Sequence, residues 1–228
     1  MLDLGTIIPG TTLYVPFHSF DSNDPSASVT LTGLAATDIE IYKDGSVTQR
    51  ASDTGYTLLD TDGIDFDGIT GIHGFSIDLS SNATAGFYAA GHQYWVVVAS
   101  VTVDAATINF VAATFRIGYP NAILNTTIAA YTNATSFTLN EGSATNDAYN
   151  GYVLLAHDVA SDVETKIGYV SDYVGASKGI TLEADLVSGF VLTAADNISL
   201  FLPSNTAAIN QALMRGKGNS GDLFLGPA

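Results

Sequence analysis

The chain has 228 residues, of which 46% are hydrophobic and 13% charged, a balance that excludes a disordered chain because it supplies enough apolar surface for a core. Twenty-three acidic residues against seven basic ones give a formal net charge of −16, which disfavours nucleic acid as a partner, and the absence of cysteine excludes disulfides and thiolate metal sites. We expect no membrane segment, because no apolar run reaches roughly 18 residues, and no leader peptide, because Met1–Gly5 lacks a basic start.

Residue usage predicts an all-β fold, because Thr, Val, Ile, Tyr, Gly and Asn abound whereas the polar helix formers are scarce. Short apolar runs between turn signals are typical of a sandwich or a barrel. The Asp44-Gly45 pair between two alternating segments predicts a tight hairpin. The strands expected in the first half are 12–17, 29–32, 39–43, 46–50, 75–79, 94–101 and 107–117.

The segment from Tyr94 to Val101 carries two expectations. Its nearly continuous apolar run predicts a strand buried on both faces. In immunoglobulin-like sandwiches a Tyr near the start of a late strand bonds back across a corner, and a core residue follows two positions later. Tyr94 and Val96 fit these positions, so we expect residues 1–118 to form an Ig-like β-sandwich.

A linker is expected at 118–121, where Pro120 would interrupt a central strand. Beyond it, short apolar runs separated by Gly, Asn and Asp predict a small β-barrel or compact sandwich over 119–203. Its expected strands are 136–139, 152–156, 166–171, 180–183 and 198–202.

Residues 204–228 are expected to form a short helix and a C-terminal arm. Ser204 or Asn205 would cap the helix, and Ile209 and Leu213 would share its docking face. The arm ends in the apolar residues Leu223, Phe224 and Leu225. They form either a docking peptide that binds a neighbouring subunit, for example as an edge strand, or a segment that packs on its own domain.

An acidic cluster, with Asp60, Asp62, Asp65 and Asp67, offers hard oxygen ligands of the kind that Ca²⁺ takes. The spacing does not match an EF-hand loop. A solvated turn followed by an edge strand is therefore the favoured interpretation, and no metal site is predicted.

Other chemistry-bearing residues also lack a recognisable pattern. His18, His73, His92 and His157 show no ligand spacing, and no nucleophile elbow or phosphate-binding loop is present. No catalytic residue and no cofactor is predicted. Four tyrosines could form a sugar-binding platform, or they could simply occupy ordinary positions in strands and interfaces. They are Tyr149, Tyr152, Tyr169 and Tyr173.

Two stretches resemble modules of tailed-bacteriophage structural proteins. Residues 27–117 resemble a common virion domain through the segments 32–35, 39–45, 70–73, 77–80, 86–88 and 91–94. Residues 134–203 are similar to a second virion module through the segments 137–139, 146–151 and 167–173.

The resemblance implies a non-enzymatic virion protein that is assembled in the cytoplasm of the bacterial host. It would dock on the particle as a capsid decoration, fibre or tail-adaptor subunit. The implied partners are major capsid or tail proteins and further copies of the chain, with neither nucleic acid nor membrane. A carbohydrate-binding module for host attachment is the alternative, and a polysaccharide depolymerase is a weaker rival.

The arm hypothesis predicts the outcome of deleting residues 217–228. Particles assembled with the shortened chain should lose it on washing, because the deletion removes the apolar docking peptide. Quantitative blotting of washed particles measures the retained fraction. Full retention would show that the arm makes no essential subunit contact.

Overall fold

The computed structural model describes residues 1–161, 165–186 and 190–203, and over these residues the chain is all-β as predicted. It forms fourteen strands and two single-turn 3₁₀ helices, η1 (Ala36–Asp38) and η2 (Phe66–Gly68). The expected C-terminal helix and arm lie outside the described residues, and with them the docking candidates Ile209, Leu213, Leu223, Phe224 and Leu225.

The chain divides into two compact units. Unit 1 consists of Met1–Gly5, Thr12–Phe87 and Gln93–Arg116. Unit 2 takes Thr6–Thr11, Tyr88–His92 and the described residues from Ile117 onward. The expectation that 1–118 and 119–203 are separate domains stays a prediction.

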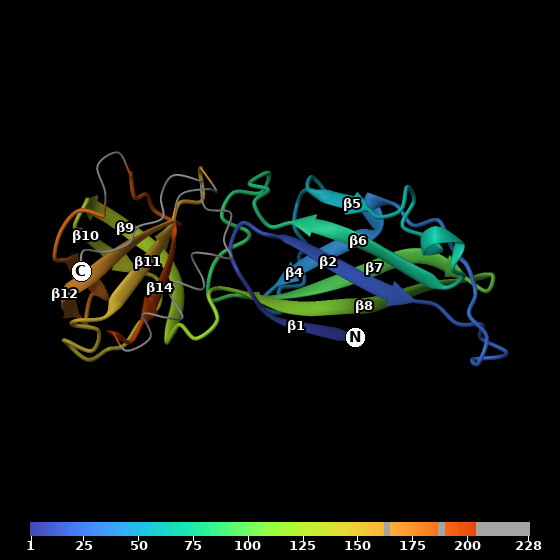
Figure 1. Ribbon diagram of the computed structural model, residues 1–228, viewed down its shortest axis with the longest axis horizontal. Helices are drawn as coiled ribbons and strands as arrows, with labels where there is room; N and C mark the ends of the chain where they lie inside the picture. Colours follow the sequence, from blue (N-terminus) through green and yellow to red (C-terminus); the bar gives the residue numbers. More distant parts are fainter. Residues whose placement is uncertain (162–164, 187–189, 204–228) are drawn as a thin grey trace. The chain divides into compact units, whose positions relative to one another are not determined.

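Unit 1 is built from two sheets (Figure 1), in which β7 pairs antiparallel with β3, β4 and β8, and β6 pairs antiparallel with β2 and β5. The larger sheet has the order β1-β8-β7-β3, and β4 pairs with β7 beside β3. The smaller sheet has the order β2-β6-β5. The strands of the larger sheet are β1 (Leu2–Ile7), β3 (Leu31–Thr32), β4 (Ile39–Lys43), β7 (Gln93–Val103) and β8 (Ala106–Ile117). Those of the smaller sheet are β2 (Thr12–His18), β5 (Tyr56–Leu58) and β6 (Ile72–Asp78).

The core of unit 1 lies between these sheets. Along β2, Leu13, Val15 and Phe17 are buried while the intervening residues are exposed, as the period of two in a strand requires. The ring of Phe17 lies 5.3 Å from that of Phe110 in β8, so side chains of the two sheets meet across the interior.

Tyr94 makes the corner contact that the sequence predicts. Its side chain is fully buried, and its hydroxyl donates to the carbonyl of Phe87 at 2.8 Å. Its ring stacks on Phe115 at 4.9 Å, and Val96, two residues on, is also fully buried.

The predicted hairpin at Asp44-Gly45 forms its turn, but the returning segment makes only a short pairing with β4. Both residues adopt positive φ, 51° and 72°, as a tight turn requires. Residues 46–50 do not form a regular strand. Gln49 makes an isolated antiparallel bridge with Tyr42, and the Arg50 N–H donates to the Ile41 carbonyl at 2.8 Å, whereas β4 pairs along its whole length with β7. Beyond this short pairing the chain forms a loop, which Arg50 holds because its buried guanidinium donates to the carbonyls of Ser52, Thr54 and Ser81.

Unit 2 is a closed six-stranded barrel with the order β10-β13-β12-β11-β14-β9. All neighbouring strands are antiparallel. The first residues of β9 pair with β14 and the later ones with β10, which closes the ring. The strands are β9 (Leu124–Asn133), β10 (Ser136–Leu139), β11 (Val153–His157), β12 (Thr165–Val174), β13 (Gly179–Leu182) and β14 (Asn197–Phe201). Of the two architectures expected here, the barrel is confirmed.

Strands β11 and β14 are buried along their whole length. One face, with Leu154 and Leu200, points into the barrel core. The other face, with Leu155 and Phe201, packs against Tyr119 outside the barrel. Burial on both sides explains why these strands are continuous apolar runs.

The stability of unit 1 should depend strongly on the buried guanidinium of Arg50. Arg50→Lys leaves a point charge that cannot reach three carbonyls at once, so we expect the free energy of unfolding to fall by about 2–3 kcal/mol. Denaturant unfolding followed by fluorescence measures the loss. The exposed residue Arg116 provides the matched control Arg116→Lys, and equal losses in the two variants would contradict the anchoring role.

Candidate functional site

A polar groove in unit 2 has a volume of about 360 Å³, within the range of small-molecule sites. Strand β9, the loop after β10 and the segment Tyr88–His92 surround it. The lining residues are Ala90, Gly91, His92, Asn125, Thr126, Thr127, Asn140 and Glu141.

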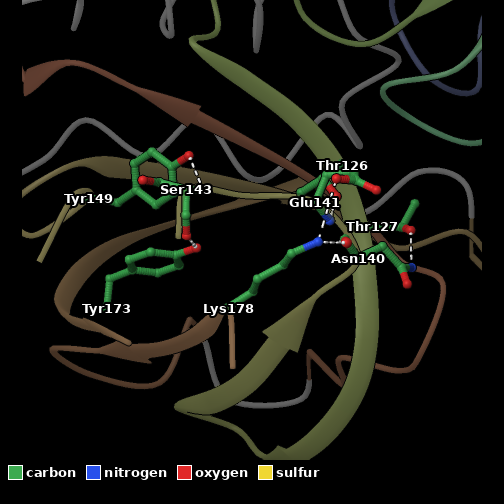
Figure 2. Close-up of polar contacts among 8 residues, drawn as sticks. All are labelled: Thr126, Thr127, Asn140, Glu141, Ser143, Tyr149, Tyr173 and Lys178. Carbon is green, nitrogen blue, oxygen red and sulfur yellow. Dashed lines mark hydrogen bonds and ion pairs between the residues drawn. The ribbon is translucent and has the colours of Figure 1, made fainter. Parts of the chain in front are cut away.

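The loop after β10 is held on one side by β9, as Figure 2 shows. The backbone N–H of Glu141 donates to the hydroxyl of Thr126 at 3.0 Å. The Asn140 side-chain amide donates to the hydroxyl of Thr127 at 2.7 Å, and its backbone N–H donates to the Thr127 carbonyl at 2.9 Å. Thr126 and Thr127 are buried, so these hydroxyls form part of the barrel wall.

Two tyrosines and a lysine hold the other side of the same loop (Figure 2). The Ser143 N–H donates to the Tyr149 hydroxyl at 2.9 Å, and the Tyr173 hydroxyl donates to the Ser143 carbonyl at 2.6 Å. Burial raises the pKa of the Tyr173 phenol, which keeps it a donor. Lys178 Nζ lies 2.5 Å from the Asn140 carbonyl and 3.5 Å from a Glu141 carboxylate oxygen.

These contacts do not assemble the tyrosine platform that the sequence offered as an alternative. Tyr149 and Tyr173 are engaged with the loop and with each other, at 4.6 Å between ring centroids. Tyr152 packs against the barrel core and against Tyr149, at 5.7 Å between ring centroids, while Tyr173 is fully buried. Tyr169 is exposed on β12, so the four rings do not share one surface.

The back of the groove is a close backbone approach at Gly91. Its φ is +88°, and a Cβ atom there would lie 2.4 Å from the Asn125 carbonyl oxygen. Next to it, the Ala90 N–H donates to the Asn197 side chain at 2.7 Å. The groove therefore offers a rigid set of amide, hydroxyl and carboxylate groups that can bind a polar molecule.

The groups that line this groove can donate and accept hydrogen bonds. Glu141 contributes the carboxylate of its lining, and that group is exposed and paired with Lys178. Hydrolysis of a glycoside uses two carboxyl groups that face each other across the bond. Within the described ranges, no group of three or more His, Asp or Glu side chains is arranged to hold a metal ion.

The acidic cluster forms a turn, as favoured from the sequence, but residues 60–67 run into η2 and not into an edge strand. Asp60 accepts the N–H of Asp67 at 2.5 Å, and Asp62 accepts the N–H of Ile64 at 3.0 Å. Asp65 accepts the Gly71 N–H at 2.7 Å and the Thr30 hydroxyl at 2.5 Å. The Thr30 bond lowers the pKa of Asp65. Three of the four carboxylates thus hold the backbone of their own loop.

The histidines are divided between the units, with His18 and His73 in unit 1 and His92 and His157 in unit 2. His73 is fully buried, and its Nε2 lies 2.6 Å from the hydroxyl of Ser19. The Ser19 hydroxyl also lies 2.5 Å from the Val29 carbonyl and donates its proton there. Nε2 must therefore donate to Ser19, which is opposite to the direction a general base would need.

An aromatic surface that the sequence analysis missed lies on the outer face of the larger sheet. The expectation that 94–101 is buried on both faces is wrong, because Tyr94, Val96 and Val98 are fully buried whereas Trp95 is 45% exposed. Trp95 pairs directly with Tyr42 of β4. Because Trp and Val are both apolar, the hydropathy of the run hides its alternation.

Comparisons of the chain with protein-family models, with curated proteins and with solved structures found no match. Of the described residues, no helix has the length and apolar character needed to cross a membrane.

His73 predicts how the stability of unit 1 depends on pH. Burial lowers the pKa of His73 below its ordinary value of 6.5; nearby Asp65 opposes this shift and His18 adds to it. The unfolded chain then binds a proton more readily than the folded one, so this residue destabilises the fold as the pH falls below about 6.5. The His73→Gln variant should show a smaller loss of melting temperature between pH 7.5 and 5 than the parent chain. An unchanged pH dependence in His73→Gln would refute the assignment.

Proposed function

We propose that this protein is a non-enzymatic structural subunit of a tailed-phage particle, which docks as a capsid decoration, fibre or tail-adaptor component. The sequence resemblance of both halves to virion modules supports the proposal. The two β units support it as well, because each carries its own buried core. Docking would occur between copies of the chain and with capsid or tail proteins.

We propose further that unit 1 is an Ig-like sandwich. The bond from Tyr94 to the Phe87 carbonyl has the form of a tyrosine corner, and the two-sheet core agrees with it. Sandwich domains of this kind present loops at their ends and strand edges at their sides, and both can contact neighbouring subunits.

The observation that carries the docking role is the exposure of β1. This strand lies at one end of the larger sheet and pairs with β8. Leu2, Asp3, Gly5 and Thr6 are exposed, and Leu4 and Ile7 are half-buried. An edge strand without proline offers a row of backbone donors and acceptors to another chain, and its apolar side chains would be buried when a second strand adds.

A second candidate function is attachment of the particle to a host-surface glycan. The exposure of Trp95 on a sheet face, beside Tyr42, favours it. An aromatic ring that is presented on a rigid strand can stack against a sugar ring without any turnover.

The docking proposal predicts the effect of charge on the β1 edge. Leu2→Lys combined with Leu4→Lys should abolish self-association and retention on particles, because lysine on an edge strand opposes strand addition. Analytical ultracentrifugation of the full chain, with blotting of washed particles, measures both effects.

The matched control places the same charges elsewhere on unit 1. Val47, which is 95% exposed, and the exposed residue Ile69 can be changed to Lys together, and association should persist. If the parent chain is a monomer at all concentrations and is absent from particles, the docking role is wrong.

A further inference from the structure

We propose that the outer face of the larger sheet of unit 1, centred on Trp95, binds a neutral pyranose ring of a bacterial surface glycan. The inference deepens the second candidate function and rests on it. We call this surface the Trp95 face and define it by Trp95, Tyr42, Glu40, Gln93 and Arg116.

The strand register places these side chains together. Tyr42 of β4 pairs with Trp95 of β7, and Trp95 pairs on its other side with Thr114 of β8. Directly opposed residues in antiparallel strands project from the same face, with Cβ atoms about 5 Å apart. Trp95 therefore lies at the centre of a row of three strands, flanked by an aromatic ring and by a buried threonine.

The next rows add hydrogen-bonding groups on the same face. Gln93 is two residues before Trp95 and pairs with Arg116, and both are exposed. On β4, Glu40 is two residues before Tyr42, whose hydroxyl donates to the Glu40 carboxylate. An amide, a guanidinium and a carboxylate thus surround the rings, supplying both donors and acceptors.

This combination suits a sugar ring. A pyranose presents C–H groups on its face, which pack on the electron-rich face of an indole, and hydroxyls at its rim, which both donate and accept. The bond to Glu40 holds the Tyr42 ring in place, so the two aromatic rings are set by the strands rather than by a loop. The second carboxylate oxygen of Glu40 is an acceptor for a rim hydroxyl.

A second copy of the chain fits this face less well. Stable protein interfaces bury about 800 Å² per partner, around a core of several apolar anchors. The apolar part of the Trp95 face is one half-exposed indole with the partly buried Tyr42 and Val97, and one aromatic side chain contributes about 150–250 Å² at most. Charged and amide groups border this area on both sides along the strands.

The net charge of the chain favours uncharged glycans over anionic ones. A formal charge of −16 repels polyanionic polysaccharides. The ligand class that remains is a neutral hexose or N-acetylhexosamine polymer.

The experiment exploits the fact that Trp95 is the only tryptophan among the 228 residues. The full chain is first applied to an array of neutral and anionic bacterial polysaccharides. Its intrinsic fluorescence is then titrated with maltohexaose, cellohexaose, chitohexaose and oligosaccharides prepared from each polysaccharide that binds. We expect a saturable change in the tryptophan emission with a neutral oligosaccharide, since the ligand covers the sole fluorophore.

Four variants separate the Trp95 face from other surfaces. Trp95→Ala should lose array binding, and Tyr42→Ala should raise Kd about tenfold through loss of one stacking partner. Tyr42→Phe keeps the ring and should bind within about threefold of the parent chain. Tyr14→Ala removes an aromatic ring that is 61% exposed in the other sheet and should bind as the parent does.

Each other outcome has a defined meaning. Array binding that survives Trp95→Ala would overturn the assignment to this face but keep the glycan function. No binding to any glycan would end both, and binding to anionic glycans alone would overturn the neutral class. A shift in emission that depends on protein concentration without sugar would identify the face as a contact between copies.

Discussion

The structure depends on one constraint, the need to satisfy backbone amides where the chain leaves its strands. Long connections in a β protein carry many N–H groups that no ladder can pair. Short side chains meet this need here: Asp60 and Asp62 within one loop, Asp78 at the turn after β6, and Asp196 at the turn before β14 each accept backbone N–H groups. Aspartate suits this task, because its short carboxylate reaches an amide two or three residues away, as for Asp62, Asp78 and Asp196, or one that the loop brings close, as for Asp60.

This constraint also accounts for much of the acidic character of the chain. A carboxylate that holds a turn adds a negative charge without creating a site for catalysis or for metal. Asp65 illustrates the point, because both of its oxygens are engaged, one with Gly71 and one with Thr30. Acid clusters in a loop-rich β protein are therefore weak indicators of chemistry, and the groups with capacity for a ligand lie elsewhere.

Strands were predicted correctly from the sequence where the alternation of apolar residues and the residue composition both indicate a strand. Strand β2, strand β4 and the later strands of the barrel were placed within a few residues of their observed bounds, because each carries apolar residues on at least one buried face. Strand β1 was missed since it is exposed along most of its length and has no pattern to detect. Strand β9 was missed because it changes partner midway, so Leu124–Asn133 does not keep one alternation.

The candidate site was harder to predict than the fold, for a related reason. Hydropathy cannot distinguish an aromatic residue that faces solvent from one that faces the core, so Trp95 was hidden inside an apolar run. The hairpin arm is shorter than predicted for a different reason, since Arg50 holds the following loop through the carbonyls of Ser52, Thr54 and Ser81. Contacts of that kind follow from the assembled structure and have no signature in the local sequence.

The edge and the face that we assign to docking and to glycan belong to one sheet, and this arrangement has a physical rationale. Strand addition at β1 extends the ladder sideways and leaves the outer face of β7 and β4 uncovered. The buried residues Tyr94, Val96 and Val98 anchor β7 from the inner side, so Trp95 is presented on a rigid support. Ligand groups held on strands are positioned more accurately than those on loops. Copies joined along their edges would repeat the Trp95 face at regular spacing, and weak contacts with single sugar rings would then add up to firm attachment.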